Sequence, residues 1–291
     1  MSDVQEPPAE QAARGHGVQG ELAKDRRVGT EDLTHWPTRV GSALAAFAER
    51  VAEKLGPYAA LLISLVVGLA IAFTLSVVAV EVYDAVTDAD GVAGLDRPLL
   101  DLSLQFRNPT ADAVITAITD VAGTIGMPII AVSAMLILGI RRRSWTPVIL
   151  ITVAAAGSLL MTVAGKDLIG RERPPLGDAV PPYEYSPSFP SGHTLNAVVV
   201  IGIIVYLILL RQHSRRTRIL LIVGGTVFAV VVGLSRVYLG HHWFTDVLAG
   251  WLLGAAWLAL VITAHRMYLT ARAHRPDGGE LGRKLSTSDR K

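Results

Sequence analysis

The sequence predicts an all-α polytopic membrane protein, a bundle of six transmembrane helices with both termini in the cytoplasm. Hydrophobic residues make up 51% of the 291 positions, and the mean hydropathy is +0.42. Only 18% of the residues are charged, below the roughly 25% usual for soluble domains. A spanning helix needs roughly 20 mostly apolar residues. Six windows qualify: about Ala59–Val82, Ala113–Ile140, Pro147–Gly165, Thr194–Leu210, Ile219–Tyr238 and Phe244–His265.

The six windows define a membrane domain at residues 59–265, and the flanking segments are polar. Residues 1–37 are rich in Pro, Gly and charge, which is typical of a disordered tail. Residues 38–58 predict a juxtamembrane amphipathic helix, with a solvated helix as the alternative. Residues 266–291 predict a disordered basic C-terminal tail. The second window is the weakest, because two glycines and a proline interrupt it, and its membrane part is expected to begin near Val121.

Composition also excludes several kinds of site. The chain has no cysteine, so it has no disulfide framework, thiolate metal site or cysteine nucleophile. The first 35 residues lack the apolar core and small-residue cleavage site of a signal peptide. The formal net charge of +2 is small, and no nucleic-acid partner is expected.

The positions of Lys and Arg predict the orientation of the bundle, because short cytoplasmic loops are enriched in both. Four basic segments fall on one side of a six-helix topology, which we therefore expect to be cytoplasmic. They contain Arg39, Arg50 and Lys54; Arg141, Arg142 and Arg143; Arg211, Arg215, Arg216 and Arg218; and Arg266, Arg272 and Arg275. The opposite side carries the acidic loop at residues 83–109 and three clusters of polar residues.

The first polar cluster runs from Lys166 to Pro174. Lys166 and Arg173 are seven residues apart, so both cations lie on one face if the third helix continues past the membrane. Two such cations can clamp a dianion, Arg173 as a fork and Lys166 as a point charge. The alternative is that they anchor the helix end by snorkelling.

The second polar cluster, Phe189 to Thr194, opens the fourth predicted helix. Ser191 is a favourable N-cap, and Gly192 allows a ligand to approach the backbone closely. The N–H groups of a helix N-terminus attract anions. His193 could donate a proton to a leaving group, whereas the alternative is an ordinary cap beside an interfacial histidine.

The third polar cluster runs from Ser235 to Asp246, and here function outweighs a structural role. Ser235 and Arg236 end the fifth predicted helix and can add donors for the same anion. His242 and Asp246 are four residues apart, hence stacked on one helix face. A carboxylate that fixes the tautomer of an imidazole makes its other nitrogen a nucleophile. His241 competes for this role but points about 100° away.

Together the patterns K-x6-R-P, P-S-G-H and S-R-x5-H-x3-D resemble the type 2 phosphatidic acid phosphatase superfamily, in its membrane lipid phosphate phosphatase and polyprenyl diphosphate phosphatase branch. The resemblance covers about residues 59–265. It implies that His242 attacks phosphorus to form a phosphohistidine, Asp246 holds its ring, and His193 protonates the leaving alkoxide. The phosphoryl oxygens would be held by Lys166, Arg173, Ser191, Gly192 and Arg236, with help from Ser235.

We therefore expect a metal-independent phosphatase with no cofactor, in the bacterial cytoplasmic membrane, with its active site on the extracytoplasmic face. Its substrate would be a lipid phosphomonoester or diphosphate: polyprenyl diphosphate, phosphatidic acid or phosphatidylglycerol phosphate. The alternatives are a lipid phosphotransferase that uses the same site, and a non-catalytic membrane transporter or scaffold. Haloperoxidase chemistry is disfavoured, because the relatives with that activity are soluble.

Two glycines, one loop glutamate and three histidines outside the clusters also carry an interpretation. Gly250 and Gly254 are expected to pack within the chain, with a homodimer as the alternative. Glu184, in the loop between the first two clusters, is interpreted with its tyrosine neighbours as shaping the leaving-group pocket. Three further histidines are interpreted as surface residues: His213, His265 and His274.

Overall fold

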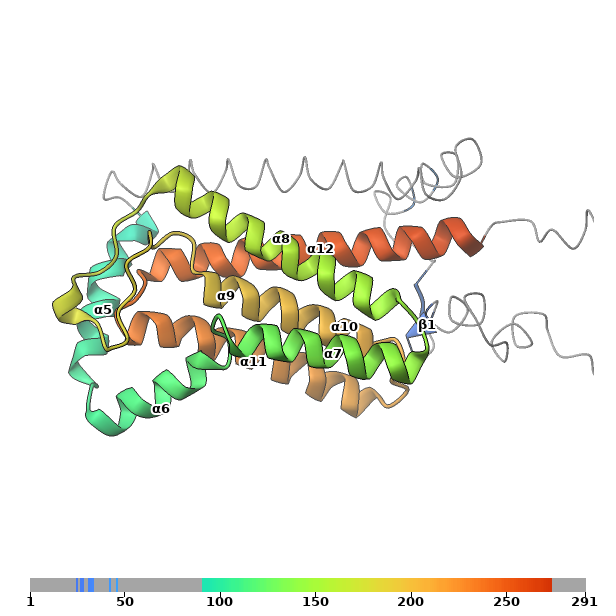
Figure 1. Ribbon diagram of the computed structural model, residues 1–291, viewed down its shortest axis with the longest axis horizontal. Helices are drawn as coiled ribbons and strands as arrows, with labels where there is room; N and C mark the ends of the chain where they lie inside the picture. Colours follow the sequence, from blue (N-terminus) through green and yellow to red (C-terminus); the bar gives the residue numbers. More distant parts are fainter. Residues whose placement is uncertain are drawn as a thin grey trace, which may run out of the picture.

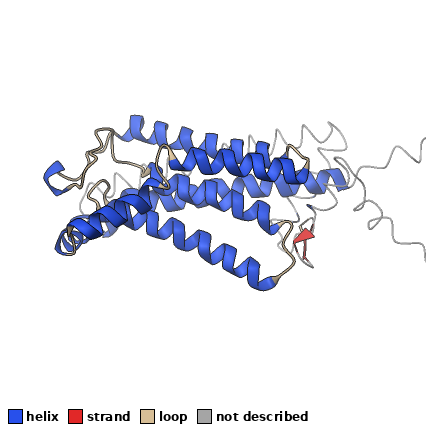
Figure 2. Cartoon of the chain, turned by 60° about the horizontal axis from the view of Figure 1, so that its bottom comes forward, coloured by secondary structure: helices blue, strands red, loops and turns tan. Residues whose placement is uncertain are grey.

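The computed structural model describes residues 91–273 and, before them, Asp25, Arg27, Val28, residues 31–33, Ser42 and Ala46. In this part of the chain the long helices run lengthwise beside one another and form an elongated bundle, and the short helix at Asp96–Gln105 stands across one end of it (Figures 1 and 2). The first transmembrane helix predicted at residues 59–82 lies outside the described residues. So does the juxtamembrane helix predicted at 38–58, apart from Ser42 and Ala46.

Most of the described backbone is helical. Two short strands, β1 (Arg27–Val28) and β2 (Glu31–Asp32), pair antiparallel. The 3₁₀ turns are η1 (Gly91–Leu95) and η2 (Leu176–Asp178), and η3 (Ala197–Ile201) is a π-helical segment. The α-helices are α5 (Asp96–Gln105), α6 (Pro109–Asp120), α7 (Gly126–Arg142), α8 (Thr146–Ile169), α9 (Gly192–Asn196), α10 (Gly202–Leu209), α11 (Arg215–Tyr238) and α12 (Phe244–Ala273).

Four described segments are long and apolar enough to cross a membrane: α8, the run α9–η3–α10, α11 and α12. Their mean hydropathies are 2.1 to 2.2. At about 1.5 Å per residue, even the 18-residue run reaches nearly the thickness of a hydrocarbon core. Large apolar side chains such as Leu160 on α8 and Leu220 on α11 are exposed, as expected for surfaces that face lipid. The third to sixth predicted helices are therefore confirmed.

The second apolar window does not form one helix, so the prediction of a single helix over Ala113–Ile140 is wrong. The structure breaks it into α6 and α7, with residues 121–125 between them. The side chain of Asn108 caps α6 by accepting from the N–H of Ala111. Since α7 begins only at Gly126, its apolar part starts later than the expected Val121.

A glycine ends α8 before the helix reaches Arg173. Gly170 has a φ of +62°, a left-handed conformation that terminates the helix at Ile169. The expectation that Lys166 and Arg173 share one face of a continuing helix is therefore wrong. The chain leaves the helix and crosses the end of the bundle as a long loop, residues 170–191 (Figure 1).

The run α9–η3–α10 supplies the centre of the core. Its side chains at Leu195, Val199 and Ile203 are completely buried. Helix α12 packs against this run at Gly250 and Gly254, where an added Cβ would lie 3.0 Å from Thr194 and 2.9 Å from Val198. The two glycines therefore serve packing within the chain, as expected.

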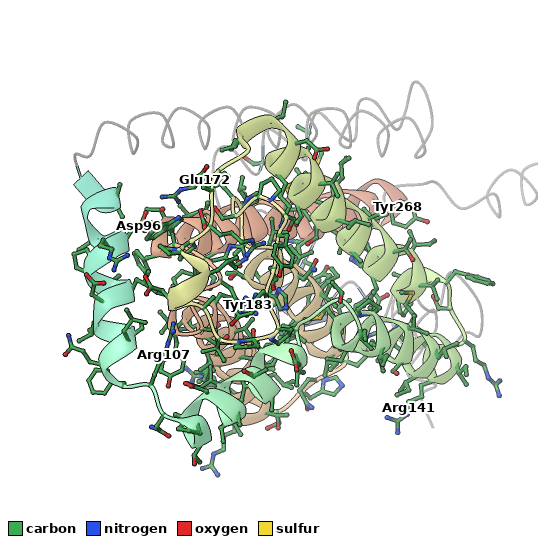
Figure 3. All side chains as sticks on the ribbon, turned by 60° about the vertical axis from the view of Figure 1, so that its left-hand side comes forward. Asp96, Arg107, Arg141, Glu172, Tyr183 and Tyr268 are labelled. Carbon is green, nitrogen blue, oxygen red and sulfur yellow. The ribbon has the colours of Figure 1, made fainter. Side chains whose placement is uncertain are left out.

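The basic loops and the polar clusters lie at opposite ends of the bundle. Arg141 and Tyr268 are at one end, and Asp96, Glu172 and Tyr183 are at the other (Figure 3). This arrangement fits the predicted separation of charge. The prediction that His265 is a surface residue is wrong: it is 5% exposed and its Nδ1 lies 2.8 Å from the hydroxyl of Tyr206. Helix α12 continues well beyond the end of the predicted window, which places His265 inside the bundle.

Replacing Gly157 with alanine should destabilise the bundle. A Cβ at this position would lie 2.1 Å from the ring of Trp257, whose indole N–H donates to the carbonyl of Ala154 at 3.0 Å. Overpacking a buried contact costs about 1–3 kcal/mol. We expect a lower thermal unfolding midpoint for the detergent-purified variant. Gly224→Ala is the control, because a Cβ there meets nothing within 4 Å. Equal midpoints for the two variants would contradict this packing.

Candidate active site

The three polar clusters meet at one end of the bundle, around a cavity of about 860 Å³. The cavity is lined from all three clusters, although each lies on a different element. Its walls include Lys166 from the end of α8, His193 from α9, Arg236 from α11, and His242 from the turn before α12. Residues far apart in the chain thus share one cavity.

His242 and Asp246 form a buried pair at the start of α12. Nδ1 of His242 lies 3.4 Å from Oδ2 of Asp246, and the two residues are 1% and 0% exposed. The same carboxylate oxygen accepts from the backbone N–H of Trp243 at 2.9 Å. An acceptor beside Nδ1 favours the tautomer that carries its proton there, which leaves the lone pair on Nε2.

Nε2 of His242 lies beside a cation. Nη1 of Arg173 is 3.3 Å from it and also donates to the carbonyl of His241 at 2.5 Å. Burial, reinforced by Arg173 and Arg236, holds the pKa of His242 well below its ordinary value. The imidazole is therefore neutral at pH 7, which is the state that a nucleophile requires.

Lys166 and Arg173 converge although no helix joins them. Nζ of Lys166 donates to the hydroxyl of Ser186 at 2.6 Å and to the carbonyl of Pro187 at 2.8 Å. Nε of Arg173 donates to the carbonyl of Ser186 at 2.6 Å. The returning loop, rather than a shared helix face, brings the two cations together.

An internal carboxylate, Glu184, bridges two of the cations. Its Oε2 lies 2.8 Å from Nη2 of Arg173, and its Oε1 pairs with Nη2 of Arg236. Burial alone would raise the pKa of Glu184, but the positive charges around it, Arg236 above all, outweigh it and lower that pKa to about 2. Glu184 therefore stays ionised at every pH at which the protein would be assayed. The sequence suggested that Glu184 shapes the leaving-group pocket. In the structure its carboxylate also pairs with two cations.

His193 faces the loop between α6 and α7. An added Cβ at Gly123 would lie 3.3 Å from Nε2 of His193 and 3.1 Å from the carbonyl of Asp120. Both Gly123 and His193 line the cavity. The missing side chain at Gly123 therefore leaves room directly in front of this ring nitrogen.

His241 is held away from the Asp246 carboxylate, in line with the predicted divergence. Its Nε2 lies 2.7 Å from the carbonyl of Val180. Burial, with help from Arg236, lowers the pKa of His241.

Two predicted donors have their hydroxyls engaged with neighbours in the chain. Ser191 precedes α9 but makes no side-chain cap, and instead its Oγ accepts from the hydroxyl of Thr194 at 2.9 Å. The N-cap prediction therefore holds for its position but not for its hydrogen bond. The hydroxyl of Ser235 donates to the carbonyl of Val232 at 2.6 Å.

Arg171 and Asp96 were not among the predicted site residues. Arg171 contacts Asp246 directly, and Asp96 reaches it through Arg171. Nη1 of Arg171 lies 2.6 Å from Oδ1 of Asp246, and Nη2 lies 2.7 Å from Oδ2 of Asp96. The position of Arg171, two residues before Arg173, was a signal in the first cluster. Asp96 gave no such signal, since it is one of several aspartates in an acidic loop.

Comparisons with known proteins cover the part of the chain that carries the three polar clusters. The family model described as the PAP2 superfamily matches residues 146–269. Phosphatidylglycerophosphatase B of Bacillus subtilis (strain 168) is 34% identical over 180 residues, which cover 61% of this chain and 86% of that protein. An undecaprenyl-diphosphatase of Sulfolobus acidocaldarius is 42% identical over 80 residues, which cover 28% of this chain and 33% of that protein.

A solved structure gives the same result. The crystal structure of a transmembrane PAP2 type phosphatidylglycerolphosphate phosphatase from Bacillus subtilis superposes with a TM-score of 0.57 at 29% identity, covering 64% of this chain and 93% of that one. Sequence and fold therefore agree over the membrane domain. The chain belongs to the PAP2 superfamily, in its branch of membrane lipid phosphatases.

Proposed function

We propose that this protein hydrolyses a lipid phosphomonoester or diphosphate through a phosphohistidine at His242. The observation that carries the proposal is the set of groups around the His242 ring, which leaves Nε2 neutral and next to a cation. Asp246 holds the opposite ring nitrogen at 3.4 Å, burial keeps the ring neutral, and Arg173 lies 3.3 Å from Nε2. An anion drawn to that guanidinium would bring its phosphorus next to the lone pair.

The cations supply the charge that phosphoryl transfer needs. Arg173, Arg236 and Lys166 would hold the non-bridging oxygens, together with Gly192 and its neighbour Ser191. Since Glu184 already pairs with both arginines, the substrate phosphate must displace that carboxylate. Three cations can neutralise the transferring group without a metal ion, so we propose that the reaction is metal-independent.

The reaction has two steps. Nε2 of His242 attacks phosphorus as the bond to the leaving oxygen breaks, and His193 donates its proton to that oxygen. Water then attacks the phosphohistidine while His193 takes a proton from that water. Free His242 is restored and orthophosphate is released. Asp246 stabilises the charged ring of the intermediate.

The relatives' names indicate the class of substrate. One is a phosphatidylglycerophosphatase and another an undecaprenyl-diphosphatase, and both names describe removal of phosphate from a lipid. We extend that class to this chain, as phosphatidylglycerol phosphate, phosphatidic acid or a polyprenyl diphosphate. With the basic loops in the cytoplasm, the cavity would open at the outer face of a six-helix domain.

His242→Ala should abolish turnover, and Asp246→Asn should cripple it. Loss of a nucleophile that acts with its partners as a unit costs at least about 10³-fold in kcat. Asp246→Asn removes the carboxylate that fixes the tautomer, which should cost about 10²-fold or more. The measurement is phosphate release from a panel of the three lipids by detergent-purified protein. Undiminished release by either variant would reject the assigned roles.

Glu184→Gln should increase the affinity for phosphate-like anions. The neutral amide competes less well for Arg173 and Arg236, so the inhibition constant for vanadate should fall about tenfold, a change of about 1.4 kcal/mol. The matched control is Glu172→Gln, an exposed glutamate in the same loop. Weaker vanadate inhibition in Glu184→Gln than in the wild type would contradict displacement of this carboxylate.

Gly123→Ala should slow the reaction most when the leaving group needs a proton. The added methyl group would crowd Nε2 of His193, so we expect at least about a tenfold loss of kcat on a lipid phosphate with an alkoxide leaving group. The loss should be much smaller on p-nitrophenyl phosphate, whose leaving group is stable as an anion. Gly94→Ala, where a Cβ meets nothing within 4 Å, is the control. Equal losses on both substrates would argue against His193 as the proton donor.

A further inference from the structure

We propose that Asp96 and Arg171 are positioning residues of this site, because Arg171 bridges Asp96 to Asp246 and thereby holds the Asp246 carboxylate against His242. The inference rests on the proposed function, in which His242 is the nucleophile. It adds two residues that are not fixed positions of the three motifs, and one of them, Asp96, lies on α5.

The guanidinium of Arg171 is fixed from three directions. Nη1 lies 2.6 Å from Oδ1 of Asp246, and Nη2 lies 2.7 Å from Oδ2 of Asp96. The guanidinium carbon is 5.7 Å from the centre of the Trp243 ring, at a distance typical of a cation–π contact. The side chain is only 13% exposed. Such a planar fork suits two carboxylates in a way that a lysine ammonium does not.

Asp96 connects this guanidinium to the first turn of α12. Its Oδ1 accepts from the N–H of Thr245 at 2.8 Å, and its Oδ2 accepts from the Thr245 hydroxyl at 2.7 Å. That hydroxyl also lies 2.7 Å from Nη1 of Arg171. Asp96 thus binds both Arg171 and the residue next to Asp246, and it fastens α5 to the helix that starts beside the nucleophile.

The arrangement assigns each oxygen of Asp246 to a different partner. Oδ1 is taken by Arg171, so Oδ2 is the oxygen that faces Nδ1 of His242 and the N–H of Trp243. The carboxylate cannot rotate without breaking a charge-assisted hydrogen bond. A fixed carboxylate keeps the imidazole plane, and with it Nε2, directed at the phosphoryl position.

The alternating charges explain why both residues are needed. Asp246 is fully buried, and an ionised carboxylate there requires a cation nearby. Arg171 supplies that cation but lies closer to Asp246 than His242 does, and it would draw the carboxylate away from the ring. Asp96, 5% exposed, balances the charge of Arg171 from the other side.

The bridge from Asp96 through Arg171 to Asp246 is called the brace below. If it positions the nucleophile, its loss should lower kcat with little change in KM. The groups proposed to hold the phosphate are other side chains, so removing the brace should misdirect the nucleophile without weakening substrate binding. We expect Asp96→Asn and Arg171→Gln each to lower kcat on p-nitrophenyl phosphate about 10- to 100-fold. KM should stay within about threefold. In the double variant the losses should not multiply, because Asp96 acts through Arg171.

Asp101→Asn is the matched control. Asp101 lies on the same helix, α5, where its half-exposed side chain pairs with Arg97 at 2.8 Å. This variant should keep the wild-type kcat. Thr245→Val provides a milder test if a charged-residue variant fails to fold. It removes only the hydroxyl between Asp96 and Arg171, and it should lower kcat about threefold or more at unchanged KM.

The outcomes separate this inference from the proposed function. Wild-type kcat in the folded Asp96 and Arg171 variants, a loss confined to KM, or losses that multiply in the double variant would overturn the brace. If His242→Ala retains wild-type turnover, or the wild type releases no phosphate, the proposed function fails instead.

Discussion

The site depends on one constraint, which is that an ionised carboxylate must be kept beside a neutral imidazole where neither is exposed to water. Burial of an unpaired carboxylate costs several kcal/mol, so Asp246 can be charged only because the protein supplies donors around it. The Trp243 N–H and the Arg171 guanidinium are these donors. Once the carboxylate is fixed, Nδ1 of His242 has its acceptor, and Nε2 is left for chemistry.

The fold meets this constraint by dividing the work between helices and loops. The run α9–η3–α10 and helix α12 are buried against each other and carry His193 and Asp246 on rigid backbone. The cation Arg173 comes instead from the loop that follows Gly170. Glu184 comes from the same loop and pairs with Arg173 and Arg236 through a carboxylate that the substrate phosphate would replace in the proposed reaction. A cluster of buried positive charges is therefore compensated before the substrate arrives.

The membrane helices and the grouping of the clusters could be predicted from sequence, because both rest on strong local signals. Long apolar windows predicted all four candidate spans among the described residues. The four-residue spacing of His242 and Asp246 indicated their contact, since adjacent turns of a helix stack side chains. The seven-residue spacing correctly predicted that Lys166 and Arg173 lie near each other, but not why. Gly170, in a left-handed conformation, ends the helix between them, and the loop brings them together.

The remaining features depend on tertiary contacts that no local pattern encodes. Asp96 meets Arg171 only because α5 folds against the start of α12, and Glu184 reaches two arginines only because its loop returns over the cavity. His265 is buried because it lies against Tyr206 of another helix, α10, and no local pattern indicates that contact. Gly123 and Gly126 indicated the break between α6 and α7. Nothing in the sequence indicated that this break lies in front of His193.

The most direct test is a structure of the protein with bound vanadate, which can adopt the five-coordinate geometry of a phosphoryl group under attack. We expect a vanadium–nitrogen bond to Nε2 of His242, vanadate oxygens on Arg173 and Arg236, and the Glu184 carboxylate displaced from both. Vanadate bound elsewhere in the cavity, with Glu184 still paired to the two arginines and His242 unbonded, would contradict this expectation.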